Sequence, residues 1–413
     1  MWKELNGYDR WMFGVLLLLM AATNTSTGGA SIGIALGALI VLVQGIRRRC
    51  FPRIDKGIGI VILIHLALWA VASFFSFDPQ HSFRELWAAA YRFFPLFFAM
   101  LYIRETWQLR WLWLVFALSV FVDDAKALWQ YATFQDLGWG HRPTGFNHSP
   151  TFLASHMLMA IPVLLFAAGR DYMGSRDRKF LLVTAGFAFL VLILSGTRGG
   201  WLAFLGTAAV YAICDKAYRK RAVMAFASLL LLLCLGAACS TSFQSRLMTM
   251  TDPSYQSNSE RLLMWQSALQ IIRDYPVTGV GMDEFGLVYN TKYISPFAKE
   301  RAESLEKYWT GHGHPHNNIL KMFSEGGILG LSAFLILHGY FFWRFLRLWR
   351  RERHPFPYGL MAILVLTVLQ LEGLTDTNMN QVPIMREYWL LAGTVLAAGR
   401  VETEGAFKGD DNG

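Results

Sequence analysis

Three histidines lie close together in a polar segment that leads into a long apolar stretch. The segment reads Gly311-His312-Gly313-His314-Pro315-His316-Asn317-Asn318. Proline is typical of a helix start, so we expect His316 in or near the first turn of a helix. The partial positive charge at a helix N-terminus binds phosphate. His316 could then act as a general base beside a bound anion, with His314 and Asn317 close to it.

Two other interpretations of this histidine cluster stay open. One is a zinc site, although no cysteine or carboxylate is expected close enough to complete a tetrahedral set. The other is a plain polar loop at a helix start. We expect no metal and no other cofactor. The sequence has no Asp-x-Asp pair to clamp a metal-bound nucleotide sugar, and no Walker sequence for ATP.

Four arginines are candidates for substrate binding. Arg198 lies in a short turn between two apolar stretches, where glycines let the backbone approach a phosphate closely. The alternative for Arg198 is a side chain that reaches from the membrane surface into water. Arg142 and Arg261 are weaker candidates, since each could be an ordinary surface charge. Arg92 lies inside an apolar stretch, which predicts a buried polar role, either structural or substrate-facing.

The composition is that of an integral membrane protein. Of the 413 residues, 54% are hydrophobic and 16% are charged, whereas soluble proteins carry roughly 25% charged residues. These values exclude a disordered chain, a disulfide-rich scaffold and an ordinary cytosolic enzyme. We attribute the net charge of +9 to the excess of Lys and Arg on the cytoplasmic side of membrane proteins. Membrane lipids are therefore expected partners, and nucleic acid is not.

Apolar runs of about 20 residues predict membrane-spanning helices. Twelve candidates occur, at approximately 10–24, 28–46, 57–77, 84–103, 109–131, 151–168, 179–196, 199–214, 222–239, 317–346, 356–374 and 384–400. The fold class is thus all-α, with nine spans in residues 1–239 and three in 317–400. Residues 240–316 form one large external loop, with an amphipathic helix expected over 259–273. The polar tail, 401–413, is expected to be disordered.

The distribution of Lys and Arg sets the orientation of these spans. Basic residues gather in alternate connections, whereas the connections at 25–27, 78–83 and 375–383 contain none. This bias predicts that both termini and the tail are cytoplasmic. It places the large loop, the histidine cluster and Arg198 on the outer side of the membrane.

Several of these segments together resemble the superfamily of O-antigen ligases and O-antigen polymerases of bacterial envelopes. The ligase signature is His, then Asn, Ser or Gln, nine residues, and G-x-x-G. It is matched by His316-Asn317 and Gly327-Ile328-Leu329-Gly330. Residues 195–201 resemble the S-x-x-R-G-x-W turn of the family. The R…W…P…G-x-G stretch of its large periplasmic loop is resembled by Arg261, Trp265, Pro276 and Gly279-Val280-Gly281.

The resemblance implies a fold similar to the GT-C class of glycosyltransferases. It also implies an activity, the transfer of a glycan from undecaprenyl diphosphate to the lipid A core in the bacterial inner membrane. This reaction of lipopolysaccharide biosynthesis would be metal-independent and inverting, at a site that faces the periplasm. In that case His316 is the general base, and Arg198 and Arg261 bind the carrier diphosphate. Further candidates for substrate binding are His314, Asn317, Arg142 and Arg92.

Other functions fit parts of the same pattern. In an O-antigen polymerase the acceptor is a second carrier-linked glycan, and related members of the superfamily glycosylate proteins. A transporter of another class would also fit twelve spans, with Arg92 lining a pathway. Against a transporter, the polar residues gather on the outer face, whereas transporter sites lie near the middle of the bilayer.

Overall fold

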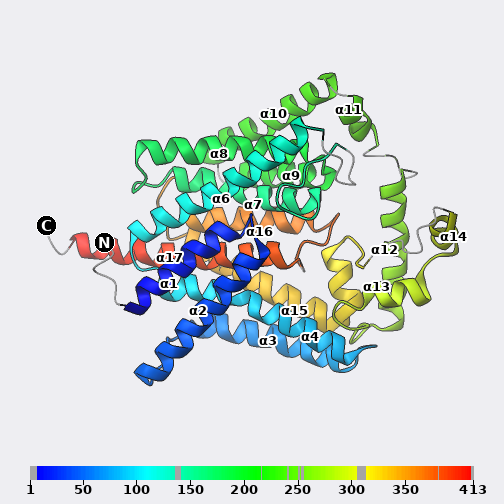
Figure 1. Ribbon diagram of the computed structural model, residues 1–413, viewed down its shortest axis with the longest axis horizontal. Helices are drawn as coiled ribbons and strands as arrows, with labels where there is room; N and C mark the ends of the chain where they lie inside the picture. The colour runs from blue at the N-terminus through cyan, green and yellow to red at the C-terminus, as the bar shows by residue number, and fades with distance from the viewer. Residues whose placement is uncertain are drawn as a thin grey trace.

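The computed structural model describes residues 7–134, 141–214, 216–239, 241–249, 252, 255–304, 313–379 and 381–410. Within these ranges the regular structure is helical and includes no strand. Figure 1 shows the long helices packed side by side, with both chain ends at one end of the bundle. The opposite end carries α12 (Gln256–Asp274), α13 (Phe285–Val288) and α14 (Pro296–Ser304). The prediction of an all-helical fold is confirmed for the described residues.

The first part of the chain forms ten helices and one short 3-10 turn. They are α1 (Gly7–Ala22), α2 (Thr27–Arg48), α3 (Lys56–Phe74), α4 (Pro79–Ala90), η2 (Tyr91–Phe93), α5 (Phe94–Tyr102), α6 (Thr106–Ala132), α7 (Pro150–Ala168), α8 (Ser175–Leu194), α9 (Arg198–Cys214) and α10 (Lys216–Cys239). The single span expected at 84–103 is therefore divided. Pro95 lies at the start of α5, because a proline lacks the amide hydrogen that would continue the preceding helix.

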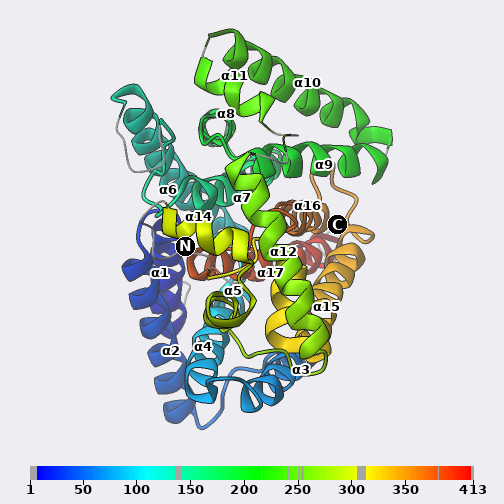
Figure 2. The same cartoon turned by 90° about the vertical axis from the view of Figure 1, so that its right-hand side faces the viewer.

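The large loop contains α11 (Thr241–Met248), η3 (Tyr289–Tyr293) and the three helices at the end of the bundle. The amphipathic helix expected over 259–273 is confirmed as part of α12. Its apolar face, with Met264, Ala268 and Ile271, packs against Phe285 and Tyr289 in a small core of its own. Figure 2 shows α12 lying across the end of the bundle.

The last part of the chain forms α15 (Asn318–Trp349), α16 (Tyr358–Glu372) and α17 (Val382–Asp410). The expectation of a disordered tail is wrong for residues 401–410, which continue α17 as a helix. An ion pair between Arg170 and Glu402 fixes the first turn of this extension. Residues 411–413 lie outside the described residues.

Four described helices are long and apolar enough to cross a membrane, namely α2, α3, α7 and α15. Every other predicted span overlaps a helix or, at 84–103, a divided helix. Large apolar side chains are exposed along the bundle, among them Trp11, Ile32, Leu63 and Leu231. Such side chains are stable on a surface that faces lipid. The apolar helices therefore indicate a membrane protein.

The large loop is joined to α15 where this helix is kinked. Gly327 has φ 57° and ψ −154°, a backbone conformation that is open essentially only to glycine. The kink exposes backbone groups that pair with the loop, since the amide of Ile328 donates to the Pro276 carbonyl at 2.9 Å. The amide of Gly281 donates in turn to the Glu325 carbonyl at 2.8 Å.

This joint leaves no room for side chains. A Cβ on Gly327 would lie 2.3 Å from the backbone of Val277, and one on Gly279 would lie 2.3 Å from the backbone of Glu325. The G-x-x-G and G-x-G segments, which are far apart in the sequence, are thus two halves of one contact. The contact fixes the end of α12 relative to the start of α15.

Candidate active site

His316 lies just outside α15, in the left-handed region with φ 49°. The helix is capped by Asn317, whose side-chain oxygen accepts a hydrogen bond from the Leu320 amide at 3.0 Å. The expectation of His316 in or near the first turn is met, since His316 directly precedes the N-cap, although Pro315 itself lies outside the helix. Asparagine is among the most favoured N-cap residues, and the helix begins at Asn318, one residue after the predicted start of the span at 317. His316 remains adjacent to the helix N-terminus.

The imidazole of His316 is paired with Asp376, which lies 60 residues away in the connection between α16 and α17. His316 Nδ1 and Asp376 Oδ1 are 2.9 Å apart. Burial alone would raise the pKa of Asp376, but the hydrogen bond and charge of His316 outweigh it and hold the pKa below its usual value. Asp376 is therefore a carboxylate at neutral pH. A carboxylate that accepts from Nδ1–H favours the tautomer whose lone pair is on Nε2, the nitrogen that can take up a proton.

Further hydrogen bonds hold the α16–α17 connection against the start of α15. The Asn318 amide donates to the Gly373 carbonyl at 2.7 Å, and the side-chain amide of Asn317 donates to the Leu374 carbonyl at 3.0 Å. The Asn318 side chain donates to Asn378 Oδ1 at 2.8 Å. Asn317 and Asn318 thus align the carboxylate with the imidazole.

His314 lies next to His316, with ring centroids 4.4 Å apart. Burial lowers the pKa of His314 to about 3, helped by the nearby charges of His316 and Lys321. His314 is therefore neutral at physiological pH. Its Nδ1 atom is buried and has no hydrogen-bond partner within the described residues, so it can accept a bond from a ligand. His312 lies outside the described residues.

The sequence argument against zinc assumed that no carboxylate lies near the histidines, and that assumption is wrong. His314, His316 and Asp376 each offer a ligand atom, and these atoms lie within 4.8 Å of one another. The fold brings Asp376 to the cluster from a separate connection between helices, which the local sequence cannot reveal. Three ligands of these types could hold a metal ion.

Three of the candidate arginines lie around one cavity beside His316. The cavity is lined by Arg142, Thr151, Gly196, Thr197, Arg198, Gly199, Arg261, Glu372, Thr375 and Asp376. Asp376 therefore belongs both to this cavity and to the pair with His316. Three guanidinium groups around one cavity are a suitable arrangement for a doubly charged phosphate ligand.

Part of the chain is similar in sequence to known proteins. Residues 183–335 match the family model described as O-Antigen ligase. A curated O-antigen ligase of Salmonella typhimurium is 29% identical over 173 residues. The match covers 39% of this chain and 38% of that relative, so it spans well under half of either protein. Both findings support the O-antigen ligase superfamily.

The part of the chain that matches the O-antigen ligase family model includes Arg198, Arg261, His314, His316 and Asn317. It ends before the α16–α17 connection and starts after the segments that carry Arg92 and Arg142. The acidic partner of His316 therefore comes from the structure and not from the match. The sequence offers only a weak signal for it, which is an aspartate in a short polar connection on the same predicted side of the membrane.

Two of the arginines, Arg142 and Arg198, are fixed by neighbouring loops. Arg142 Nε donates to the Ser195 carbonyl at 2.7 Å, which joins its loop to the turn before α9. Arg198 is 9% exposed and donates to the Thr249 carbonyl at 2.6 Å and to Asn258 Oδ1 at 2.9 Å. This burial differs from that of an arginine reaching into water. Arg198 instead connects α9 to the large loop.

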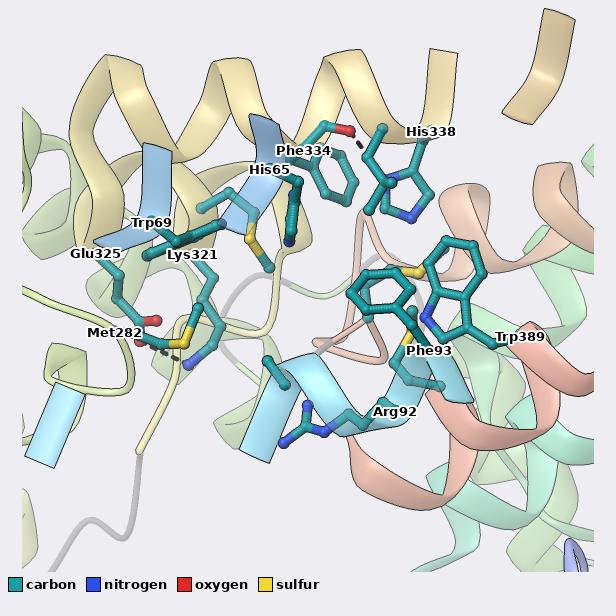
Figure 3. Close-up of a pocket in the computed structure, with 15 residues that line it drawn as sticks. His65, Trp69, Arg92, Phe93, Met282, Lys321, Glu325, Phe334, His338 and Trp389 are labelled. Carbon is teal, nitrogen blue, oxygen red and sulfur yellow. Dashed lines mark hydrogen bonds and ion pairs between the residues drawn. The ribbon is translucent and has the colours of Figure 1, made fainter. Parts of the chain in front are cut away.

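Arg92 is not part of the arginine cavity. It lines a second cavity inside the bundle, between α3, η2, α15 and α17, together with His65, Lys321, Glu325 and His338. Figure 3 shows Arg92 across this cavity from Lys321 and Glu325, whose side chains form a buried ion pair at 2.6 Å. The structure therefore separates Arg92 from the other candidates. The expectation of a buried polar role is met, since its side chain is 5% exposed.

Proposed function

We propose that this protein is an O-antigen ligase, which transfers a glycan from undecaprenyl diphosphate to the lipid A core oligosaccharide in lipopolysaccharide biosynthesis. One observation carries the proposal. Asp376, which is hydrogen-bonded to His316, lines a cavity together with Arg142, Arg198 and Arg261. A base beside a strongly cationic cavity suits the transfer of a group from a diphosphate to a hydroxyl.

The proposed reaction is a single displacement. Nε2 of His316 takes the proton from an acceptor hydroxyl, whose oxygen attacks the anomeric carbon of the donor glycan. The bond from that carbon to the diphosphate oxygen breaks, and its electron pair stays on the diphosphate. Guanidinium groups from Arg142, Arg198 and Arg261 stabilise the charge that develops there. Asp376 stabilises the imidazolium of His316, and the displacement inverts the anomeric centre.

The proposed arrangement in the membrane is GT-C-like with twelve spans. Residues 1–239 would contain nine spans, 240–316 the periplasmic loop, 317–400 three spans and 401–413 the cytoplasmic tail. The Lys and Arg bias supports this arrangement in the bacterial inner membrane. The position of α12 to α14 at the end opposite the termini also fits it. Reporter fusions at Arg351 should score cytoplasmic and one at Thr291 periplasmic. A periplasmic score at Arg351 would reverse the orientation.

The acceptor distinguishes this proposal from its nearest alternative, an O-antigen polymerase or a relative that glycosylates proteins. A chromosomal deletion examined on a lipopolysaccharide gel separates them. A ligase mutant should lose long chains on lipid A while it keeps polymerised glycan on the carrier. Loss of polymerisation itself would point to the polymerase. A transporter would leave purified protein without transferase activity, whichever acceptor is offered.

A further inference from the structure

Glu372 has no role in the reaction described above, although it lines the same cavity as the three arginines. It is the last residue of α16 and is fully buried. Only three residues separate it from Asp376. A glutamate beside a site for a diphosphate is unexpected, because a carboxylate and a phosphate repel each other.

The two carboxyl oxygens of Glu372 have different surroundings. Oε2 accepts hydrogen bonds from Ser155 Oγ at 2.7 Å and from the Asn378 side-chain amide at 3.0 Å. Oε1 is buried and has no hydrogen-bond partner within the described residues. The donors thus select one oxygen as the acceptor. They leave the other oxygen as the only part of this side chain that a ligand could satisfy.

The surroundings fit an uncharged acid better than a carboxylate. The donors that bond to Glu372 are neutral groups, the Ser155 hydroxyl and the Asn378 amide, although three arginines line the same cavity. An ionised oxygen with no donor at zero exposure is strongly unfavourable. A protonated Oε1 would instead be a hydrogen-bond donor. Asp376 differs, since its charge is matched by His316.

We propose that Glu372 is a substrate-binding residue, a neutral carboxylic acid whose Oε1–H donates a hydrogen bond to a phosphate oxygen of the carrier diphosphate. This inference rests on the proposed function, which puts the diphosphate in the arginine cavity. Ser155 and Asn378 hold Oε2 as the carbonyl oxygen and so turn the hydroxyl toward the ligand. The acid adds a donor without adding charge, in a cavity that already has three cations.

The test compares two substitutions that keep the size of the side chain. Glu372→Gln preserves the arrangement, because the amide oxygen can accept from Ser155 and Asn378 while the amide N–H donates. Glu372→Met removes both functions of the carboxyl group. The purified full-length protein is titrated with undecaprenyl diphosphate. We expect Glu372→Gln to bind within a few-fold of the wild type, and Glu372→Met to bind about 10- to 100-fold more weakly, the effect of one hydrogen bond to a charged group.

A second measurement separates this role from a purely structural one. The infrared difference spectrum on addition of undecaprenyl diphosphate should show a shift of the carbonyl stretch of a protonated carboxyl. That band should be absent in Glu372→Gln. Thermal unfolding of each variant in detergent shows whether it is folded. If Glu372→Met is unfolded, the affinity of Glu372→Gln for undecaprenyl diphosphate and the infrared band of the wild type still test the proposed role of Glu372.

The outcomes distinguish this inference from the proposed function. Wild-type protein that does not bind undecaprenyl diphosphate would contradict the proposed function. If the wild type binds and folded Glu372→Met binds equally well, only the inference on Glu372 is overturned. It is also overturned if Glu372→Gln binds as weakly as Glu372→Met, because the charge would then be required. Absence of the carboxyl band from the wild-type spectrum has the same consequence.

Discussion

Asp376→Asn is the most direct test of the proposed base. The substitution keeps the size of the side chain and leaves an amide oxygen that can accept from Nδ1 of His316. It removes the negative charge that faces the imidazolium formed during the reaction. Because the pKa of Asp376 is below its usual value, the wild-type residue is charged at every pH used for assay. The charge that the substitution removes is therefore the same from pH 6 to pH 9, a range that begins roughly two units above the pKa of an ordinary carboxyl group.

The size of the effect follows from the geometry of the pair. With Nδ1 and Oδ1 2.9 Å apart, the charge centres are about 4 Å apart, and at an effective dielectric constant of about 20 they attract by about 4 kcal/mol. The side chain of His316 is 25% exposed, so water screens part of this attraction. We therefore expect a loss of about 2–4 kcal/mol in transition-state stabilisation, or about 30- to 1,000-fold in turnover. Carrier binding should change much less.

The assay is single-turnover ligation with purified protein, alongside titration with undecaprenyl diphosphate. His316→Ala serves as the reference and should cost about 10²- to 10⁴-fold in turnover. In the His316→Ala background, Asp376→Asn should add little, because the two residues act as a unit. Near-normal turnover of Asp376→Asn would refute the pairing argument. Equal additional losses in both backgrounds would show that Asp376 acts independently of His316.

Three further predictions concern the arginines, the metal question and the joint between loop and helix. Arg198→Lys and Arg261→Lys should each lose about 10-fold or more in carrier affinity, because one ammonium cannot replace a planar fork; Arg273→Lys, on the exposed end of α12, should be unaffected. Ligation should survive EDTA and need no ATP, and rescue of EDTA-treated protein by Zn²⁺ or Mg²⁺ would require a metal at the histidines. Gly327→Ala should destabilise the joint by at least about 2 kcal/mol, seen as faster hydrogen exchange at 276–281, whereas Gly339→Ala, with open space around it, should not.

Much of the helical framework could be predicted because it depends on local properties. A lipid environment requires long apolar runs, and those runs are visible in the sequence. The amphipathic spacing of α12 is equally local, and the structure confirms that helix. The exception at 84–103 was also readable, since Pro95 lies in the middle of the apolar run. The prediction of a single span there followed the mean hydropathy of the run and did not take the proline into account.

The candidate site could be predicted only in part. Residue chemistry singled out Arg142, Arg198 and Arg261, and the structure brings all three to one cavity. Asp376 and Glu372 were missed because their roles depend on which connections meet in space. The sequence around each of these two residues contains no motif that predicts which side chain it contacts. The place of His316 beside the start of α15 was readable from the sequence, whereas the capping role of the Asn317 side chain was not identified.

The large loop positions both halves of the proposed reaction, and this gives the glycine segments a physical role. Arg261 and Trp265 lie one turn apart on α12. Arg261 lines the cavity, and the indole N–H of Trp265 donates to the Pro315 carbonyl at 2.9 Å, directly before His316. One helix therefore carries an arginine that we propose binds phosphate, and it supports the segment that carries the proposed base.

The far end of α12 runs into the backbone contact between Gly279 and the kink at Gly327. The contact joins the loop to α15, the helix that begins directly after His316 and its cap. Neither His316 nor Arg261 lies within a predicted span, so the packing of the bundle alone does not fix the distance between them. That distance depends on the joint at which the backbone of the loop contacts the backbone of α15. A single added methyl group there would separate the base from the diphosphate site without touching either one.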